Sequence, residues 1–232
     1  MRACADANIY PSELDRIIVC TVTPDQIVPS TASLVQARIG AMNAGAFDLQ
    51  AACAGFVYGL SVAASMIATG MHRRVLLIGA DTLTRYVDYT DRKTCILFGD
   101  GAGAVIMAAT DENRGVMHYS LHADGTHSQV IGIPAGGTRT PSNHDTVALR
   151  QHFIQVEGRR VFKFATNAFV DLTRDAMKAC GLSVDDVAML VPHQVNARII
   201  DAALKRLEFP REKCFSNIDR YGNTSAASIP IA

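Results

Sequence analysis

The sequence predicts an α/β fold built from two related halves, and two observations support this prediction. Several short apolar runs lack any alternation of polar and apolar residues, namely 16–20, 75–79 and 187–191. Such runs are typical of strands that helices cover on both faces. In addition, two stretches of the chain resemble each other at a spacing of 171 residues. Repetition at so long a period indicates a duplicated unit.

Composition narrows the class of protein. The chain has 232 residues, and its 22 Lys and Arg residues balance its 22 Asp and Glu residues. A nucleic-acid-binding protein would show a basic excess, so we expect no nucleic-acid partner. Because 49% of the residues are hydrophobic, the composition also argues against disorder. A chain of this length buries roughly 70% of its surface on folding, which requires neither a disulfide nor a metal.

The N-terminal elements follow in order. The run 16–20 predicts a strand, and the pattern over 30–38 predicts a helix. Residues 51–68 contain no charge and precede a basic stretch at 72–74, which superficially suggests a membrane span. The segment is rich in Ala, Gly and Ser, so we favour a buried central helix and expect no membrane contact.

The next elements are strands and an irregular segment. After the strand predicted at 75–79, the glycines at 99–103 are spaced G-x-G-x-G and continue into an apolar run, 104–107. A dinucleotide-binding loop would open a helix instead, so we reject nucleotide binding and predict a strand. Residues 111–145 are rich in Gly and Pro, which indicates a binding loop or mobile cover, or else disorder. A last strand is predicted at 187–191.

The repeat relates three polar residues. Ser12–Asp15 precedes the first strand as Ser183–Asp186 precedes the strand at 187–191, which aligns Val22 with His193. Cys53 follows Val22 by 31 residues, and Asn223 follows His193 by 30. Equivalent helix starts approach each other in a doubled unit with pseudo-twofold symmetry. We therefore predict that Cys53, His193 and Asn223 converge.

The repeat also suggests domain boundaries and missing ends. We expect one half at residues 1–115 and the other at 116–232. Comparison of the two copies suggests that roughly 26 residues are absent before the first copy and roughly 47 after the second. We therefore expect this chain to be a fragment of a longer protein.

The three residues have the chemistry of a reaction centre. Cys53 stands at a predicted helix start, where the N–H groups and the helix dipole favour a thiolate, although a Cys among alanines is commonly a packing residue. The neighbouring Gly55 allows close approach of a ligand or backbone. His193 follows a predicted strand, although a lone His is often structural. An imidazole and an amide together bind a developing oxyanion, and a thiolate beside them can hold an acyl group.

Cysteine usage suggests a reducing compartment. The six cysteines include no C-x-x-C pair, so neither a zinc site nor a redox dithiol is expected. We see no secretory signal in the first residues and expect a cytoplasmic location. We expect most of these cysteines to be plain buried thiols and predict no metal ligands.

Basic residues gather in two places. Arg159, Arg160 and Lys163 lie close in sequence, and Arg198 and Lys205 are seven residues apart, on one face of a predicted helix with Arg206 beside it. This pattern fits an anionic partner or a solvated helix face.

Four segments resemble the motifs of β-ketoacyl-acyl-carrier-protein synthase III. They are Gln50–Phe56, Phe98–Ala104, Val191–Ile199 and Asp219–Ala227. By resemblance, the elongating ketoacyl synthases carry a Cys-His-His set at these positions and thiolases a Cys-His-Cys set. Asn223 therefore distinguishes this chain from both of those families. The resemblance implies a thiolase-like fold with two pseudo-symmetric α/β halves in layers, αβαβα, working as a homodimer.

The resemblance also implies a reaction and its residues. Cys53 takes an acyl group from acyl-CoA, and His193 and Asn223 hold the thioester oxygen of malonyl-acyl carrier protein during decarboxylation. The resulting enolate attacks the Cys53 thioester to give 3-oxoacyl-acyl carrier protein, which initiates fatty-acid synthesis. Coenzyme A thioester is a substrate, and no cofactor is bound permanently.

Further positions match the family pattern. The resemblance implies that Arg92, Gly158 and Asn196 form the coenzyme A site, where Arg92 and Gly158 bind the substrate and Asn196 orders the site. Phe98 lines the acyl pocket, and Val28 lies in the loop that closes the partner subunit's pocket. The basic residues that resemble the docking surface for the acidic carrier protein are Lys163, Arg198, Lys205 and Arg206.

Two alternatives stay open at this level. One is a synthase III-like enzyme of secondary metabolism with an unusual acyl starter. The other is a catalytically inactive folding or dimerisation module, because complete family members resemble this chain with an added N-terminal segment and a C-terminal Gly-rich strand.

Overall fold

The computed structural model describes residues 1–232, which form two compact units. Unit 1 comprises Met1–Asp81, Asp100–Tyr119 and Thr224–Ala232, and unit 2 comprises Thr82–Gly99 and Ser120–Asn223. The predicted halves 1–115 and 116–232 refer to the sequence repeat rather than to these units, so that division stays a prediction.

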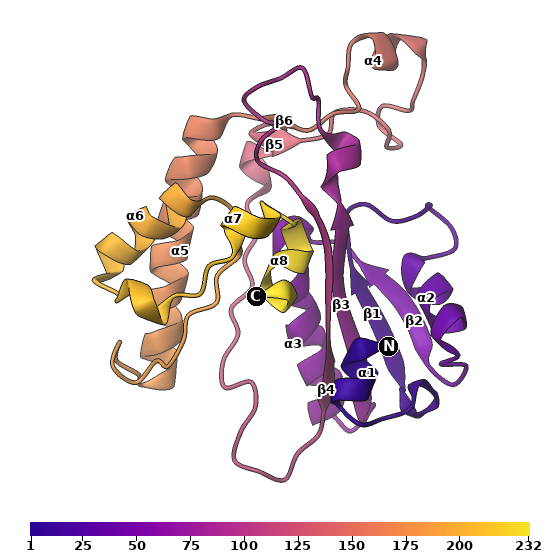
Figure 1. Ribbon diagram of the computed structural model, residues 1–232, viewed down its shortest axis with the longest axis vertical. Helices are drawn as coiled ribbons and strands as arrows, with labels where there is room; N and C mark the ends of the chain where they lie inside the picture. Colours follow the sequence, from indigo (N-terminus) through magenta and orange to yellow (C-terminus); the bar gives the residue numbers. More distant parts are fainter. The chain divides into compact units, whose positions relative to one another are not determined.

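Unit 1 is built on a four-stranded sheet with the order β2-β1-β3-β4 (Figure 1). The strands are β1 Arg16–Cys20, β2 Gly45–Leu49, β3 Arg74–Thr82 and β4 Asp100–Ala108. β1 pairs in parallel with both β2 and β3. The strands predicted at 16–20, 75–79 and 104–107 are thereby confirmed.

Helices cover both faces of this sheet. Unit 1 contains α1 Arg2–Asp6, α2 Thr31–Ile39 and α3 Gly55–Ala68, with a 3₁₀ turn, η1, at Pro11–Glu13. In Figure 1, α3 lies on one side of the sheet, and α1 and α2 lie on the other.

Alternate side chains of β1 enter two separate cores. Ile17 and Val19 pack in one cluster with Ala32 of α2, whereas Ile18 and Cys20 pack in another with Phe56 of α3. Both sides of the strand are therefore apolar, which explains why its sequence shows no alternation and confirms the prediction of a strand buried on both faces.

Local sequence fixes the ends of α2. The side chain of Ser30 accepts a hydrogen bond from the Ser33 N–H at 3.2 Å, and Gly40 ends the helix in the left-handed conformation with φ 75°. Asp48 of β2 accepts hydrogen bonds from the N–H groups of Thr31 and Ala32 at 2.8 and 2.7 Å. A carboxylate at the N-terminus also complements the helix dipole.

The uncharged segment 51–68 forms the turn η2 and the helix α3, which confirms a helix; only one face of α3 is buried, so the expectation of a wholly buried helix is wrong. Phe56 and Ala63 of α3 pack against β1 and β3 residues in the core of unit 1. Nowhere does the structure contain a helix with both the length and the apolar character needed to cross a bilayer.

The repeat is visible as two similar turns. A 3₁₀ turn, η2 (Ala52–Ala54), leads directly into α3, and a second, η6 (Ser225–Ala227), leads directly into α8 (Ser228–Ile231). The first residue of each turn has a positive φ, 47° for Ala52 and 51° for Ser225. By this geometry the counterpart of Cys53 is Ala226. Asn223 lies three residues earlier in its copy, so the near-equivalence inferred from spacing needs this correction.

Helices are the main regular elements of unit 2, and much of the unit is irregular. Its longest helix, α5 (Gly158–Cys180), packs against α6 (Ala197–Leu207) through a core that includes Val170, Ile200 and Leu204. The remaining elements are short: η3 Leu83–Tyr86, η4 Gly125–His127, β5 Ile131–Gly132, α4 His144–Ala148, β6 Gln155–Val156, η5 Arg211–Lys213 and α7 Ile218–Tyr221. Strands β5 and β6 pair in antiparallel fashion.

The strand predicted at 187–191 is wrong as a regular strand. The segment pairs at one point, between Leu190 and Cys214, through two backbone hydrogen bonds of 2.8 and 2.9 Å. None of residues 187–191 is buried, and Ala188, Met189 and Val191 are exposed, so this apolar run has neither the burial nor the continuous pairing that a central strand requires. The segment 111–145, in turn, carries only η4, β5 and the start of α4, and most of its residues are exposed.

Candidate active site

Cys53 lies at the carboxyl edge of the unit 1 sheet. Cys20 at the end of β1 is in register with Leu49 of β2 and with Gly79 of β3. The carboxyl ends of these strands therefore lie side by side: Asp81 is near the end of β3, and Thr21 and Cys53 lie in the segments that follow β1 and β2. Ligand and reaction sites of open α/β sheets lie at this edge.

The environment of Cys53 favours a protonated thiol. Although the residue as a whole is half-buried, protein encloses its sulfur, and this burial raises the thiol pKa. A hydrogen bond from the Ser225 side chain lowers the pKa and the negative charge of Asp81 raises it, leaving a net increase. The expectation of a thiolate favoured by the helix start is therefore wrong for this arrangement, because burial outweighs the N-terminal N–H groups.

Gly55 permits close packing of protein against protein. A Cβ at this position would lie 3.3 Å from Cys20 Cβ and 3.4 Å from Ala226 Cβ. The absence of a side chain thus allows the start of α3 to approach both β1 and η6. The close approach anticipated from the sequence is confirmed, and the neighbour is backbone and core rather than a ligand.

Asp81 and Ser225 are site residues that the sequence reasoning missed. Asp81 is 2% exposed and sits near the end of β3, where its carboxylate accepts hydrogen bonds from unit 1 residues. Ser225 begins η6, and its side chain lowers the pKa of the Cys53 thiol. A charged residue inside an otherwise apolar strand was the one available signal for Asp81, because buried carboxylates are rare without a structural or functional role.

His193 in unit 2 is half-buried as a residue, but protein encloses the Nε2 of its ring. Burial lowers the pKa of its imidazole to about 4, so the ring is uncharged at neutral pH. The next residue, Gln194, is 1% exposed; its Nε2 donates to the Pro192 carbonyl at 3.0 Å, and its Oε1 accepts from the Asn217 N–H at 3.0 Å. These bonds fix the backbone on which His193 is mounted.

Asn223 and Phe98 lie side by side in unit 2. The Asn223 N–H donates to the Leu97 carbonyl at 2.9 Å, and the Gly99 N–H donates to the Asn223 carbonyl at 3.0 Å. Gly222 supports this pairing with φ 66°, and a Cβ there would lie 3.3 Å from the Leu97 oxygen. The structure thus brings together a predicted acyl-pocket residue and a predicted catalytic residue.

The predicted convergence of all three residues stays a prediction. Cys53 belongs to unit 1, and His193 and Asn223 belong to unit 2.

The residues expected to bind coenzyme A lie in a turn, at the first residue of a helix and at a helix cap. Arg92 is exposed in a turn, and Gly158 is exposed as the first residue of α5, where a Cβ would meet no other atom within 4 Å. Asn196 caps α6, because its Oδ1 accepts a hydrogen bond from the Arg198 N–H at 2.9 Å. Its demonstrated role is therefore the start of a helix, and its link to coenzyme A stays a prediction.

The four predicted docking residues are exposed on helices of unit 2. Arg198 and Lys205 are exposed on α6, and Lys163 is exposed on α5. Arg206 of α6 donates to Asn167 of α5 at 2.7 Å, one helical turn beyond Lys163. These basic residues therefore gather on the outer surface of the α5–α6 pair.

Val28 is exposed in unit 1. It is 79% exposed and precedes Pro29 through a cis peptide bond. The adjacent Ile27 is 91% exposed. The loop therefore presents two apolar side chains to its surroundings.

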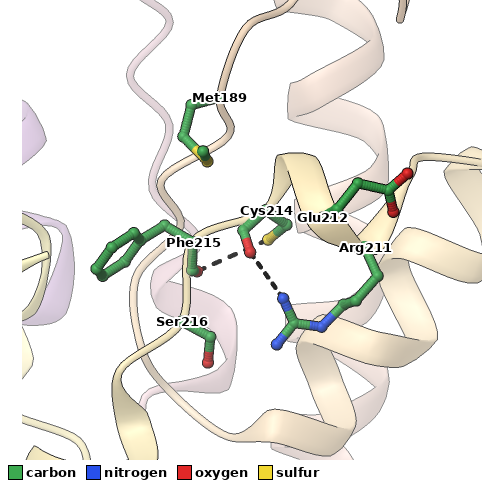
Figure 2. Close-up of a pocket in the computed structure, with 6 residues that line it drawn as sticks. All are labelled: Met189, Arg211, Glu212, Cys214, Phe215 and Ser216. Carbon is green, nitrogen blue, oxygen red and sulfur yellow. Dashed lines mark hydrogen bonds between the residues drawn. The ribbon is translucent and has the colours of Figure 1, made fainter.

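A separate pocket in unit 2 contains none of the predicted site residues. It encloses about 540 Å³, and its lining residues are Met189, Arg211, Glu212, Cys214, Phe215 and Ser216 (Figure 2). Arg211 spans part of its wall by donating to the Cys214 carbonyl at 2.7 Å, and its Nε lies 3.5 Å from Asp201 Oδ1. This pocket adjoins the point where Leu190 pairs with Cys214.

All six cysteines are unpaired thiols, of which Cys4, Cys20 and Cys214 are buried. Burial raises the pKa of Cys20 to about 12, which makes it unreactive at neutral pH. No cluster of three or more His, Cys, Asp or Glu side chains is arranged to hold a metal ion.

Comparison with known proteins gives one consistent result. Residues 47–125 match the family described as 3-oxoacyl-[acyl-carrier-protein (ACP)] synthase III, and residues 177–232 match its C-terminal domain. A β-ketoacyl-[acyl-carrier-protein] synthase III from Caldanaerobacter subterraneus is 50% identical over 231 residues, which cover 100% of this chain and 70% of the relative.

Solved structures agree with the sequence match. The 3-oxoacyl-[acyl-carrier-protein] synthase III of Aquifex aeolicus superposes with a TM-score of 0.89 at 41% identity, covering 99% of this chain and 70% of that one. The priming β-ketosynthase of the R1128 polyketide pathway superposes with a TM-score of 0.86 at 35% identity, covering 100% and 68%. These likenesses confirm the predicted thiolase-like α/β fold.

Proposed function

Because this chain belongs to the 3-oxoacyl-[acyl-carrier-protein] synthase III family, we propose that it condenses an acyl-CoA starter with malonyl-acyl carrier protein and so initiates fatty-acid biosynthesis. The product is 3-oxoacyl-acyl carrier protein, with release of free CoA and CO₂. The observation that carries this proposal is the position of Cys53 at the carboxyl edge of the sheet, on the turn η2 that packs against η6.

In the first half-reaction, Cys53 is the nucleophile. Its sulfur forms a bond to the thioester carbon of acyl-CoA, the bond from that carbon to the CoA sulfur breaks, and the thiol proton ends on CoA. A soft sulfur suits this exchange because the reaction converts one thioester into another at nearly equal energy. The half-buried position of Cys53 leaves the residue accessible while protein encloses most of its sulfur.

In the second half-reaction, His193 and Asn223 are hydrogen-bond donors. The bond between the malonyl carboxylate and its α-carbon breaks, CO₂ leaves, and the electron pair forms an enolate whose oxygen accepts these hydrogen bonds. The α-carbon then bonds to the Cys53 thioester carbon, and Cys53 leaves and regains a proton from solvent. A neutral imidazole with a pKa of about 4 supports a donor role, because it stabilises the enolate without protonating it.

The substrate contacts belong to the same proposal. We assign coenzyme A to Arg92, Gly158 and Asn196, since backbone N–H groups at the start of the 23-residue helix α5 favour phosphate. We assign the acyl pocket to Phe98, whose pairing with Asn223 supports this role, and to Val28 from a second copy of the chain in a homodimer.

We assign carrier-protein docking to the basic residues on α5 and α6. An acidic protein is attracted by exposed positive charge, and this attraction chiefly raises the association rate. The residues concerned are Lys163, Arg198, Lys205 and Arg206. A cytoplasmic location is part of the proposal, because acyl-CoA and the carrier protein are its substrates.

The test is a burst of free CoA together with intact-protein mass spectrometry. Incubation with a panel of acyl-CoAs is expected to release at most one CoA per chain and to add the mass of one acyl group. Cys53→Ala abolishes both signals, whereas the matched control Cys95→Ala, at another half-buried thiol, retains them. A burst that survives Cys53→Ala refutes the assignment.

The same panel separates the alternatives. A starter other than a simple acyl group would favour a role in secondary metabolism, which the 35% identity to a polyketide priming ketosynthase supports. An inactive module would show no reactivity at Cys53. Against that alternative, residues 225–231 are folded, since η6 and α8 pack within unit 1 and α8 contacts β4.

A further inference from the structure

Asp81 is a buried carboxylate bonded to two separate parts of unit 1. Its Oδ1 accepts hydrogen bonds from Thr21 Oγ1 at 3.0 Å, the Val22 N–H at 2.9 Å and Thr23 Oγ1 at 3.0 Å. Its Oδ2 accepts from the Ala226 N–H at 3.2 Å. One carboxylate therefore links the segment after β1 to η6, a turn 145 residues further along the chain.

The turn that Asp81 holds is packed against the turn that carries Cys53. η6 contacts η2 directly, and the Ser225 side chain acts on the Cys53 thiol, whose pKa it lowers. Ser225 adopts φ 51°, a conformation that non-glycine residues avoid unless their surroundings impose it. The bond from Ala226 to Asp81 acts on the very next residue, so it is placed to impose that conformation.

β3 also packs closely against η6 at Gly79. A Cβ on Gly79 would lie 2.3 Å from the Ala226 oxygen and 3.2 Å from Ala227 Cα. The position of η6 is thus set by two contacts with β3, one steric at Gly79 and one polar at Asp81.

We propose that Asp81 is a positioning residue for the nucleophile: it holds η6 so that the Ser225 hydroxyl bonds to the Cys53 sulfur. Ser225 then stabilises the sulfur anion that forms when Cys53 leaves the condensation product and when it attacks the next acyl group. This inference rests on the proposed role of Cys53 as nucleophile.

The opposing role for Asp81 is purely electrostatic. A negative charge near Cys53 disfavours a sulfur anion, so removing that charge would by itself make Cys53 more reactive. The two roles give different outcomes when the charge is removed without a change of shape. Asp81→Asn removes the charge and keeps the shape of the side chain. Its NH₂ group cannot accept a hydrogen bond, so the bonds from Thr21 and Thr23 or the bond from Ala226 must be lost.

The experiment measures how Ser225→Ala changes the alkylation of Cys53 in two backgrounds. Iodoacetamide reacts with the thiolate, and peptide mass spectrometry at several pH values gives the rate at Cys53, with Cys95 of the same chain as an internal reference. In the wild-type background, Ser225→Ala is expected to slow alkylation at pH 7 about tenfold and to move the pH profile upward, because a hydrogen bond to a charged group is lost.

In the Asp81→Asn background, Ser225→Ala is expected to change the rate less than twofold, because the hydroxyl no longer reaches the sulfur. A tenfold effect of Ser225→Ala in both backgrounds would overturn the proposal, as would no effect in the wild-type background. The matched control is Asp48→Asn, which removes another strand-end carboxylate that accepts backbone N–H bonds but does not bond to η6. In that background the tenfold effect is retained.

Thr21→Val is a milder background in case Asp81→Asn does not fold. It keeps the charge and removes one hydroxyl that orients the carboxylate. The effect of Ser225→Ala is expected to shrink there, and an unchanged effect counts against the proposal. Alkylation requires no acyl substrate, so a chain that lacks the CoA burst but shows this coupling would refute the proposed function and leave the role of Asp81 standing.

Discussion

The enclosed imidazole of His193 makes stability depend on pH in a window below neutrality. The imidazole has a pKa of about 4 in the folded chain and an ordinary value of 6.5. Between these values the unfolded chain binds a proton at this residue and the folded chain does not. The free energy of unfolding therefore falls as the pH drops from about 6.5 toward 4.

The magnitude follows from the difference between the two pKa values. Each pKa unit corresponds to about 1.4 kcal/mol, so protonation of His193 in the unfolded chain lowers stability by about 2 kcal/mol at pH 5, and by roughly 3 kcal/mol once the pH reaches the folded pKa. Above pH 7 both states are neutral at this residue, and it contributes no pH dependence.

Urea unfolding followed by circular dichroism at pH 7 and pH 5 measures this effect. The drop in unfolding free energy between these two pH values is expected to be about 2 kcal/mol smaller in His193→Gln than in the wild-type chain. The exposed His118 provides the control, and His118→Gln is expected to keep the wild-type drop. An equal drop in His193→Gln and wild type, or an imidazole of His193 that titrates near pH 6.5 by NMR, would refute the reasoning.

Three further substitutions test the packing of unit 1 by urea unfolding. Gly79→Ala is expected to cost about 1–3 kcal/mol, because its Cβ would collide with the Ala226 carbonyl; an unchanged midpoint would show that η6 sits elsewhere. Leu77→Ala, at a fully buried side chain, is expected to cost about 2–5 kcal/mol, and an equal loss in the partly exposed control Leu34→Ala would contradict the core assignment. Asp48→Asn is expected to cost about 1–2 kcal/mol through the lost cap of α2, and a neutral result would mean that the two N–H groups find other acceptors.

The strands of unit 1 could be predicted because both of their faces are buried, so that consecutive residues are apolar. Ile17 and Ile18 face opposite cores, so no polar position interrupts the run. The same signal failed at 187–191, where the residues are apolar but pair only at Leu190. None of residues 187–191 is buried, so an apolar run becomes a buried strand only where other parts of the chain supply a paired backbone and a covering surface.

In the candidate site, local sequence predicted the identity of the nucleophile but not the effects of residues that are distant in the chain. Cys53 could be chosen as a nucleophile from its helix start, but the direction of its pKa shift could not be predicted, because Asp81 and Ser225 act on it through contacts between distant parts of the chain. Likewise, the repeat located η2 and η6, yet counting residues across loops placed Asn223 where the geometry places Ala226.

The discontinuity of unit 1 imposes an order on its assembly during translation. The hydrogen bond between the Asp81 carboxylate and the Ala226 N–H cannot form until Ala226 has been synthesised, 145 residues after Asp81. At ordinary elongation rates this interval is about 7 to 30 s. During that interval the nascent sheet holds Cys53 without its hydroxyl partner and with part of its apolar surface uncovered. The nucleophile therefore acquires its final surroundings only when the last segment of the unit is delivered, so a stalled ribosome would present an unfinished site.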